Sequence, residues 1–256
     1  RETGVALQEN WLRIASTVFL QRGKYSKARP ILEQLIAGWP DKKDYYVQLG
    51  GVYQELGQER DSFAVLALAY SNNLPLSSSE IVRLAQLYRL YDYPYKAAKI
   101  LEKEIAAGRV TQNKSNWQEL GDSWFQAREM RKAIQPLTNA ARLAGDGDLY
   151  LRLCQTYASE DEWSNAARDC ANAINKGGLK GQFGLAYQLR GMALYEAGER
   201  EDALEAMAKC EEYENTEDNC RAWTKHITNE IAEAAAEAER KRLAEAAAEE
   251  RRWEQE

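Results

Sequence analysis

Cysteine is the residue type in this sequence with the clearest potential for chemistry. The chain has four cysteines, Cys154, Cys170, Cys210 and Cys220, and one histidine, His226. No two cysteines have the C-x-x-C spacing of a zinc or redox site, and a single histidine cannot complete one. We therefore predict no metal site. The choice for the cysteines is between disulfide bonds and buried free thiols.

Motifs for catalytic chemistry are absent from the sequence. We find no G-x-G-x-x-G and no G-x-S-x-G, and the residues GKYS at 23–26 match only the end of a phosphate-binding loop. A lone histidine such as His226, on the polar side of an apolar stripe, is expected at the surface. The sequence predicts that this protein is not an enzyme and uses no cofactor.

The elements that must position the cysteines are helices in pairs. The clearest pair spans residues 117–140, WQELGDSWFQAREMRKAIQPLTNA, with a bend at residues 128–130. Apolar and small residues recur there at helical spacing on one face of each helix. They are Trp117, Leu120, Gly121 and Trp124, then Ala133, Leu137 and Ala140. This spacing resembles the tetratricopeptide repeat (TPR) pattern, W-x2-L-G-x2-Y…A-x3-F, in which small residues let two helices approach closely.

The same pattern occurs six times. Its first positions are residues 12, 46, 81, 117, 150 and 187, at intervals of 34, 35, 36, 33 and 37 residues, close to the 34-residue TPR period. We predict an all-α TPR solenoid, a right-handed superhelix of helix-turn-helix repeats. Its six hairpins would span about 8–40, 42–75, 77–110, 113–146, 148–178 and 183–215, with extra loop residues at 144–148 and 176–184.

The predicted repeats bring the cysteines together in two pairs. Cys154 and Cys170 occupy facing positions across the fifth hairpin, and Cys210 ends the sixth hairpin just before Cys220 begins the next helix. Both pairs suit disulfide geometry, and two disulfides indicate an oxidising compartment. The alternative is that buried TPR positions accept cysteine as a small apolar residue.

The segment after the repeats, residues 216–256, has a different character. Cys220, Trp223, Ile227 and Ile231 form a narrow apolar stripe that is expected to cap the sixth repeat. Beyond it the sequence is rich in Ala, Glu, Lys and Arg, which favour helix, and only Leu243 and Trp253 are large and apolar. A helix from about residue 218 to 254 would be roughly 55 Å long, at about 1.5 Å per residue. It is predicted to be either a solvated helix or a partner-binding or spacer helix.

Binding is the function that this architecture permits, because the first helices of stacked hairpins line a concave groove. The residues between the core positions of those helices are mostly polar and neutral, with a few apolar ones, which suits an extended peptide or a partner helix. Gly51, Val82 and Leu151 also fall in this set, although Val82 and Leu151 could instead pack on the next repeat. The predicted partner-binding residues are Arg13, Thr17, Val47, Gln54, Gln86, Arg89, Gln118, Asp122, Phe125, Gln155, Met192 and Tyr195.

Charge and sequence motifs exclude several classes of partner. The net charge of −6 argues against nucleic acid as a partner. The sequence contains no apolar run of 18 or more residues, so we predict no transmembrane helix. The Lys and Asn pairs with which TPR co-chaperones hold a C-terminal carboxylate are replaced by Arg13/Thr17, Val47/Gly51 and Val82/Gln86, which argues against a chaperone clamp. Because the chain begins at Arg1, we expect it to be a processed product or an excised fragment.

Several stretches resemble a narrower family, the TPR proteins associated with TonB systems in Gram-negative bacteria. They are DYYVQLGGVYQELG at 44–57, LAQLYRLYDYPYKAAKILEKEIAAGRV at 84–110, residues 117–137, KGGLKG at 176–181 and GMAL at 191–194. The resemblance implies a periplasmic protein that works beside TonB, ExbB and ExbD, or a TonB-dependent receptor, in uptake of iron chelates or similar nutrients. The cysteines and the charged tail depart from that pattern.

The sequence thus supports two hypotheses of the same class. The first is a non-enzymatic periplasmic adaptor of a TonB-type transport system. The second is a scaffold for another envelope assembly or secretion complex that uses the same groove.

Overall fold

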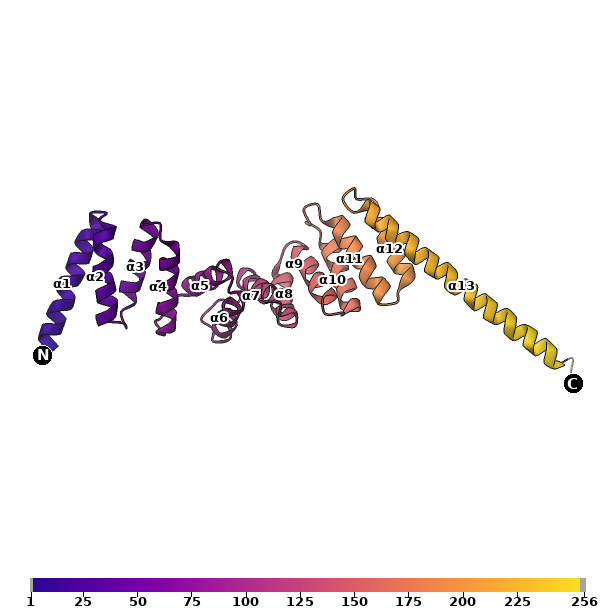
Figure 1. Cartoon of the computed structure of the whole chain (residues 1–256), viewed down its shortest axis with the longest axis horizontal. Helices are drawn as coiled ribbons and strands as arrows, with labels where there is room; N and C mark the ends of the chain where they lie inside the picture. Colours follow the sequence, from indigo (N-terminus) through magenta and orange to yellow (C-terminus); the bar gives the residue numbers. More distant parts are fainter. Residues whose placement is uncertain (1, 254–256) are drawn as a thin grey trace. The chain divides into compact units, whose positions relative to one another are not determined.

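The chain folds into α-helices. The computed structural model describes the backbone of residues 2–253 and the side chains of residues 8–248, and in that range it contains thirteen helices and no strand (Figure 1). The helices form two compact units, Arg1–Gln112 and Asn113–Glu256. The all-α prediction is confirmed.

The first unit contains three helical hairpins. α1 (Glu2–Gln21) packs on α2 (Tyr25–Gly38), α3 (Lys43–Glu55) on α4 (Glu59–Ser71), and α5 (Ser78–Leu90) on α6 (Pro94–Ala106). The start predicted for the first hairpin, near residue 8, is too late, because α1 already begins at Glu2. The Ala, Leu, Gln and Glu residues in this segment favour helix, so the helix continues beyond the part that packs on α2.

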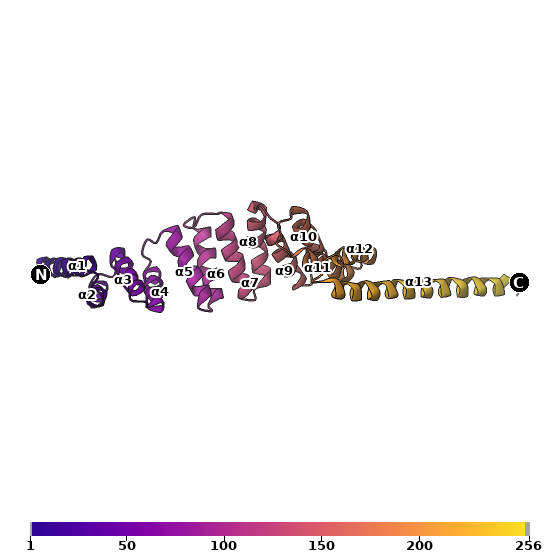
Figure 2. The same cartoon turned by 90° about the horizontal axis from the view of Figure 1, so that it is seen from above.

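The second unit contains three more hairpins and one long helix. α7 (Lys114–Gln126) packs on α8 (Met130–Leu143), α9 (Asp148–Ala158) on α10 (Trp163–Lys176), and α11 (Phe183–Glu196) on α12 (Arg200–Cys210). α13 (Glu217–Trp253) then packs its first part on α12 and α11 and continues past them (Figure 2).

Every hairpin bends through one residue in the left-handed conformation. Glycine supplies it at Gly23, Gly57 and Gly198, whereas Asp92, Arg128 and Asp161 adopt φ angles of 67°, 61° and 57°. In each case the next residue donates its N–H to a carbonyl five residues back, as Glu129 does to Trp124 at 3.0 Å. This is the Schellman arrangement that ends a helix in an αL residue. The bend geometry is therefore common to all six hairpins, although the residue type is not.

Small residues lie where the paired helices approach most closely. A Cβ atom added to Gly121 would lie 2.7 Å from the Leu137 side chain, and one added to Gly191 would lie 2.8 Å from Met207. Ala133 and Ala140, on the facing helix of the Gly121 hairpin, are fully buried. The predicted close approach within these hairpins is confirmed.

One carboxylate is fully buried in the first unit. Glu104 on α6 accepts a hydrogen bond from the Tyr70 hydroxyl of α4 at 2.7 Å. It also accepts hydrogen bonds from two nitrogens of the Arg109 guanidinium, Nε and, at 2.7 Å, Nη2. Arg109 holds the pKa of this carboxyl below its ordinary value, while burial and Glu104 raise the pKa of Tyr70. The cluster joins the second hairpin to the third.

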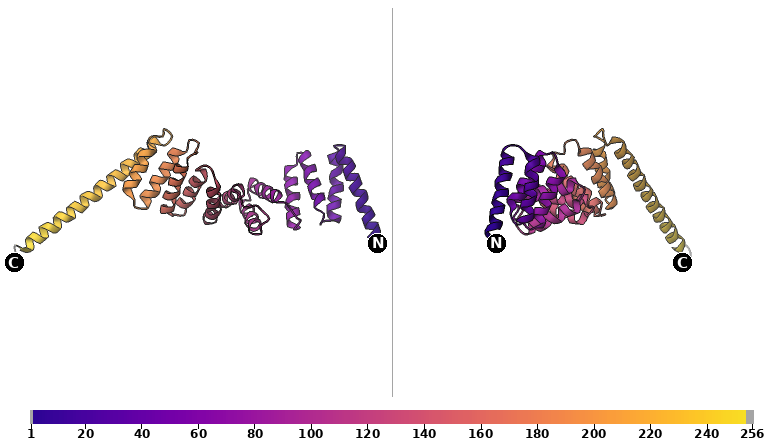
Figure 3. Two further views of the ribbon diagram at one scale, coloured as in Figure 1. Left: turned by 180° about the vertical axis from the view of Figure 1, so that it is seen from behind. Right: turned by 60° about the vertical axis from the view of Figure 1, so that its left-hand side comes forward.

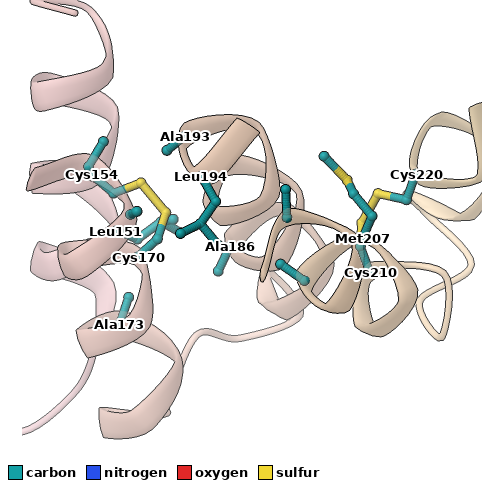
Figure 4. Packing of buried hydrophobic residues seen from close by; sticks show 14 of the residues in the cluster. Leu151, Cys154, Cys170, Ala173, Ala186, Ala193, Leu194, Met207, Cys210 and Cys220 are labelled. Carbon is teal, nitrogen blue, oxygen red and sulfur yellow. A yellow bond between two sulfur atoms is a disulfide. The ribbon is translucent and has the colours of Figure 1, made fainter. Parts of the chain in front are cut away.

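The cysteines of the second unit form the two predicted disulfides. Cys154 on α9 is bonded to Cys170 on α10, and Cys210 on α12 to Cys220 on α13. All four are fully buried and belong to one apolar cluster with Leu194 and Met207, among others (Figure 4). The first disulfide closes a hairpin, and the second attaches α13 to the hairpin before it.

α13 has a packed part and an exposed part. Cys220 and Ile227 are fully buried, and Trp223 and Ile231 pack against the same cluster, as the apolar stripe predicts. From residue 232 to 248 every side chain is exposed, and this stretch continues away from α12 (Figure 3). The helix is described as far as Trp253. Glu254 and the side chain of Trp253, which the prediction also included, lie outside the described residues.

Candidate partner-binding surface

The predicted partner-binding residues all lie on the first helix of a hairpin. Arg13 and Thr17 are on α1, Val47 and Gln54 on α3, and Gln86 and Arg89 on α5. In the second unit, Gln118, Asp122 and Phe125 are on α7, Gln155 is on α9, and Met192 and Tyr195 are on α11. The structure gathers some of these side chains around pockets and places others elsewhere.

Four of the predicted residues line one hollow in the second unit, which we name the polar pocket. It has a volume of about 530 Å³ and lies between α7, α9 and the loops that precede α9 and α11. Its walls are mostly polar and include both charge signs. The lining residues are Lys114, Gln118, Asp122, Phe125, Asp146, Asp148, Leu149, Leu151, Arg152, Gln155, Lys180 and Gln182.

Arg152 is the central cation of the polar pocket. Its guanidinium lies over the Phe125 ring at 4.8 Å, and its Nη2 is 3.8 Å from Asp122 Oδ1. Stacking on the ring holds the planar group in place while its remaining N–H donors stay available. The pocket therefore offers a positioned donor for a carboxylate or a carbonyl oxygen.

Acceptors lie close by. Asp148 begins α9, where the helix dipole stabilises negative charge, and its buried Oδ1 has no hydrogen-bond partner among the described residues. Gln118 and Gln155 project one amide each from neighbouring first helices. A side-chain amide both donates and accepts, so this pair can satisfy the backbone N–H and C=O groups of an extended chain.

The loop at the rim of the polar pocket is fixed by backbone packing. The Gly147 N–H donates to the Gly177 carbonyl at 2.7 Å, and a Cβ atom at Gly147 would lie 2.2 Å from the Ala173 carbonyl oxygen. Only glycine fits there. This contact sets the position of Asp146 and Asp148 on either side.

Sequence reasoning missed six polar residues of this pocket: Lys114, Asp146, Asp148, Arg152, Lys180 and Gln182. Five of them belong to loops or the first turn of a helix, and only Arg152 lies in a helix interior. The sequence signal for Lys180 and Gln182 is the unusual length of the loop between the fifth and sixth hairpins, where extra residues are predicted at 176–184.

In the first unit, Val47 and Gln54 line a second hollow, which we name the apolar pocket. It has a volume of about 280 Å³ and lies between α3, α4 and α5. Arg13, Thr17, Gln86 and Arg89 line neither pocket. Thr17 donates its hydroxyl to the Arg13 carbonyl of its own helix at 2.9 Å.

Tyr195 contacts the chain's own last helix, and Met192 packs against the core of the second unit. The Tyr195 ring packs edge-on against Trp223 of α13, with centroids 5.5 Å apart, and its hydroxyl donates to Glu230 at 3.0 Å. Met192 packs half-buried against the core of the second unit. Leu151 is buried as well, so for this residue the alternative of core packing is correct.

The described residues contain neither a metal-binding cluster nor a membrane-spanning helix. No group of three or more His, Cys, Asp or Glu side chains among them is arranged to hold a metal ion. None of the described helices combines the length and apolar character needed to span a membrane.

Solved structures provide the comparison. A crystal structure of MamA is 23% identical over 67% of this chain and 97% of that one, with a TM-score of 0.53. YrrB, described as a TPR protein with an unusual peptide-binding site, is 16% identical over 76% of this chain and 97% of that one, with a TM-score of 0.57. The C-terminal part of a TPR repeat-containing protein from Cytophaga hutchinsonii is 16% identical over 88% and 92%, with a TM-score of 0.53.

No protein-family model and no curated protein matches the sequence. The structural matches cover most of this chain and nearly all of each neighbour, and the neighbours described as TPR proteins agree with the all-helical hairpin architecture described above. The chain therefore has the fold of a TPR solenoid.

Proposed function

We propose that this protein is a non-enzymatic scaffold that binds an extended segment of a partner protein along the first helices of its hairpins. The observation that carries the proposal is the polar pocket. Residues predicted from two successive repeats, Gln118, Asp122, Phe125 and Gln155, line one hollow there. YrrB, with a similar fold, is a TPR protein with a peptide-binding site, which supports the same kind of ligand here.

The chemistry of the polar pocket suits a peptide backbone with an acidic side chain or terminus. The two glutamine amides pair with backbone groups, and Arg152 receives a carboxylate on its stacked guanidinium. Lys114 and Lys180 add positive charge at the rim, whereas Asp122, Asp146 and Asp148 disfavour an acidic residue placed away from Arg152. This mixture favours one register of the bound segment.

The compartment we propose is the periplasm of a Gram-negative bacterium. The support is the pair of buried disulfides in the second unit, because structural disulfides persist in oxidising compartments. A direct check is non-reducing electrophoresis of the native protein after alkylation of free thiols in intact cells. Full protection of all four cysteines agrees with export, and four alkylated thiols contradict it.

The partner class we propose is a TonB-type transport system: TonB, ExbB, ExbD or a TonB-dependent receptor. The support is the resemblance of stretches such as PYKAAK and KGGLKG to TPR proteins associated with such systems. A scaffold for another envelope or secretion complex is the alternative, and the charged tail favours it, because the tail departs from that pattern.

Site-specific photocrosslinking in the periplasm tests these proposals. A photoreactive phenylalanine analogue is placed at Gln118 or Gln155 in the polar pocket and, as the matched control, at the exposed Gln135 on α8. We expect an adduct from the pocket positions only, lost when Arg152 is changed to Glu. Peptides of TonB, ExbB, ExbD or a receptor in the adduct support the transport assignment.

Other outcomes separate the parts of the proposal. Adducts with secretion or cell-wall proteins at Gln118 and Gln155 keep the binding surface but exclude the TonB assignment. Adducts of equal yield at Gln135 show that the first-helix surface is not the binding site.

A further inference from the structure

The glycine pair in the middle of α3 has no explanation in the packing of the fold. Glycine in a helix interior costs roughly 0.5–1 kcal/mol relative to alanine, so two in succession need a reason. A Cβ atom on Gly50 would make an ordinary contact with Ser62 at 3.8 Å, and one on Gly51 would meet nothing within 4 Å. Gly121 differs, because there an added Cβ would clash with Leu137.

The apolar pocket lies beside Gly51, which has no side chain to fill it. Both glycines line it, together with apolar side chains from three directions. Those side chains are Val47 of α3, Leu66 and Ala69 of α4, Leu76 of the α4–α5 loop and Leu87 of α5. Its volume of about 280 Å³ exceeds that of an apolar cavity that admits benzene, which is about 150 Å³. The pocket has room for a large apolar side chain.

The charged groups at the apolar pocket leave one cation unpaired. Lys43 Nζ is 2.7 Å from Glu80 Oε2 and also donates to the Pro75 carbonyl, so these two charges satisfy each other. Arg83, the third charged residue of the lining, is exposed and makes no ion pair with any described residue. The pocket is thus net positive in a protein of net charge −6.

From these observations we propose that the apolar pocket binds a large apolar side chain of a partner segment whose neighbouring residue is acidic. The apolar side chain fills the space beside Gly51, and the carboxylate pairs with Arg83. This inference rests on the proposed function, since it assigns a specificity to part of the same first-helix surface. It concerns the first unit, whereas the polar pocket lies in the second.

The test uses the full chain with labelled Leu and Val methyl groups, observed by NMR. The probe is the N-acetylated, C-amidated peptide Gly-Ser-Phe-Asp-Gly-Ser, with Ser in place of Phe or Asn in place of Asp as companion peptides. We expect chemical-shift changes at Val47, Leu66, Leu76 and Leu87. Replacing Phe should weaken binding about tenfold or more, and replacing Asp about two- to fivefold.

Matched variants locate the site. Gly51→Leu fills the pocket and should abolish binding, whereas Gly38→Leu, on a helical glycine that also has nothing within 4 Å, should leave it unchanged. Arg83→Glu should weaken binding of the Asp peptide but not of the Asn peptide. Arg22→Glu, its control, should change binding of neither. If Gly51→Leu fails to fold, Val47→Glu replaces it as the pocket-blocking variant. Val47 is already half-exposed, so the new carboxylate can stay in contact with water.

The contrary outcomes are distinct. Equal binding of the Phe and Ser peptides, or no response to Gly51→Leu and Val47→Glu, overturns the apolar pocket as the site. Shifts confined to Leu149 and Leu151 support peptide binding at the polar pocket while overturning this inference. Self-association of the chain that Gly51→Leu abolishes identifies a second copy as the occupant and overturns a peptide ligand.

Discussion

Glu104 carries a fully buried charge in the first unit. Its fully buried carboxylate joins α6 to α4 through Tyr70 and pairs with Arg109, which lowers its pKa. A carboxyl with a lowered folded-state pKa contributes stability above its unfolded value, near 4.5, and this contribution is lost as pH falls toward the folded value.

We expect Glu104→Gln to destabilise the first unit by about 2 kcal/mol at pH 7, because hydrogen bonds to a buried charge are lost. The difference from wild type should shrink as the pH is lowered below about 4.5. Urea unfolding at a series of pH values measures both effects. The control is Glu102→Gln, whose pair with Lys99 is exposed and should change stability by less than about 0.5 kcal/mol. A pH-independent difference would contradict this role of the charge.

The hairpin bends give a second test at single residues. Arg128 holds φ at 61°, where a side chain costs roughly 1 kcal/mol, and the equivalent bend of the last hairpin uses Gly198 at 85°. We expect Arg128→Gly to raise the free energy of unfolding by up to about 1 kcal/mol and Gly198→Ala to lower it by about the same amount. Thermal unfolding of the two variants compares them. Destabilisation by Arg128→Gly would show that the arginine side chain makes a compensating contact.

At the scale of elements, the hairpins were predictable because each repeats one local pattern. Large apolar residues and small residues at fixed spacing define the packed faces of α7 and α8, and the same spacing returns in each repeat. The start of α1 does not follow from this pattern, because the pattern begins only at Leu12. The residues before it extend the helix to Glu2 through their intrinsic helix propensity.

The candidate site was predictable only in part. First-helix positions such as Gln118 and Gln155 follow from the repeat, but Lys180 reaches the polar pocket from a loop whose path depends on tertiary packing. Tyr195 has a groove position in the repeat, yet α13 covers it through Trp223. Which first-helix residues stay open therefore depends on neighbouring elements that the repeat pattern does not describe.

α13 allows a prediction about one element. Its side chains from residue 232 to 248 are exposed, whereas Ile227 is fully buried against the last hairpin. Deleting residues 232–256 should leave the melting temperature within about 1 °C of the intact chain, and Ile227→Ala should cost about 2–5 kcal/mol. Thermal unfolding by circular dichroism distinguishes them. A clear loss of stability on truncation would show that the exposed part contributes to folding.

At the scale of the whole molecule, the disulfides are distributed unequally between the two units. Both disulfides lie in the second unit, and the described part of the first unit contains no cysteine. In repeat proteins stability is approximately the sum of local and nearest-neighbour terms. Each disulfide closes a short loop and contributes about 2–4 kcal/mol.

Reduction should therefore weaken one unit selectively. Hydrogen exchange measured by mass spectrometry, with and without dithiothreitol, is expected to show faster exchange in residues 148–231 and unchanged exchange in residues 8–106. The double variant Cys154→Ala with Cys170→Ala should reproduce the effect within α9 and α10 without reductant. Equal acceleration in both units would show that their stabilities are coupled.

The order of the disulfides along the chain has a consequence for how the protein matures. Four cysteines allow three pairings, and in this structure the first joins the second and the third joins the fourth, at separations of 16 and 10 residues. In an exported protein, as we propose this one to be, an oxidase that links cysteines in the order in which they emerge from a translocation channel would produce this pairing directly. Maturation by that route would need a thiol oxidant but no isomerase, and it would avoid reshuffling, which takes seconds to hours.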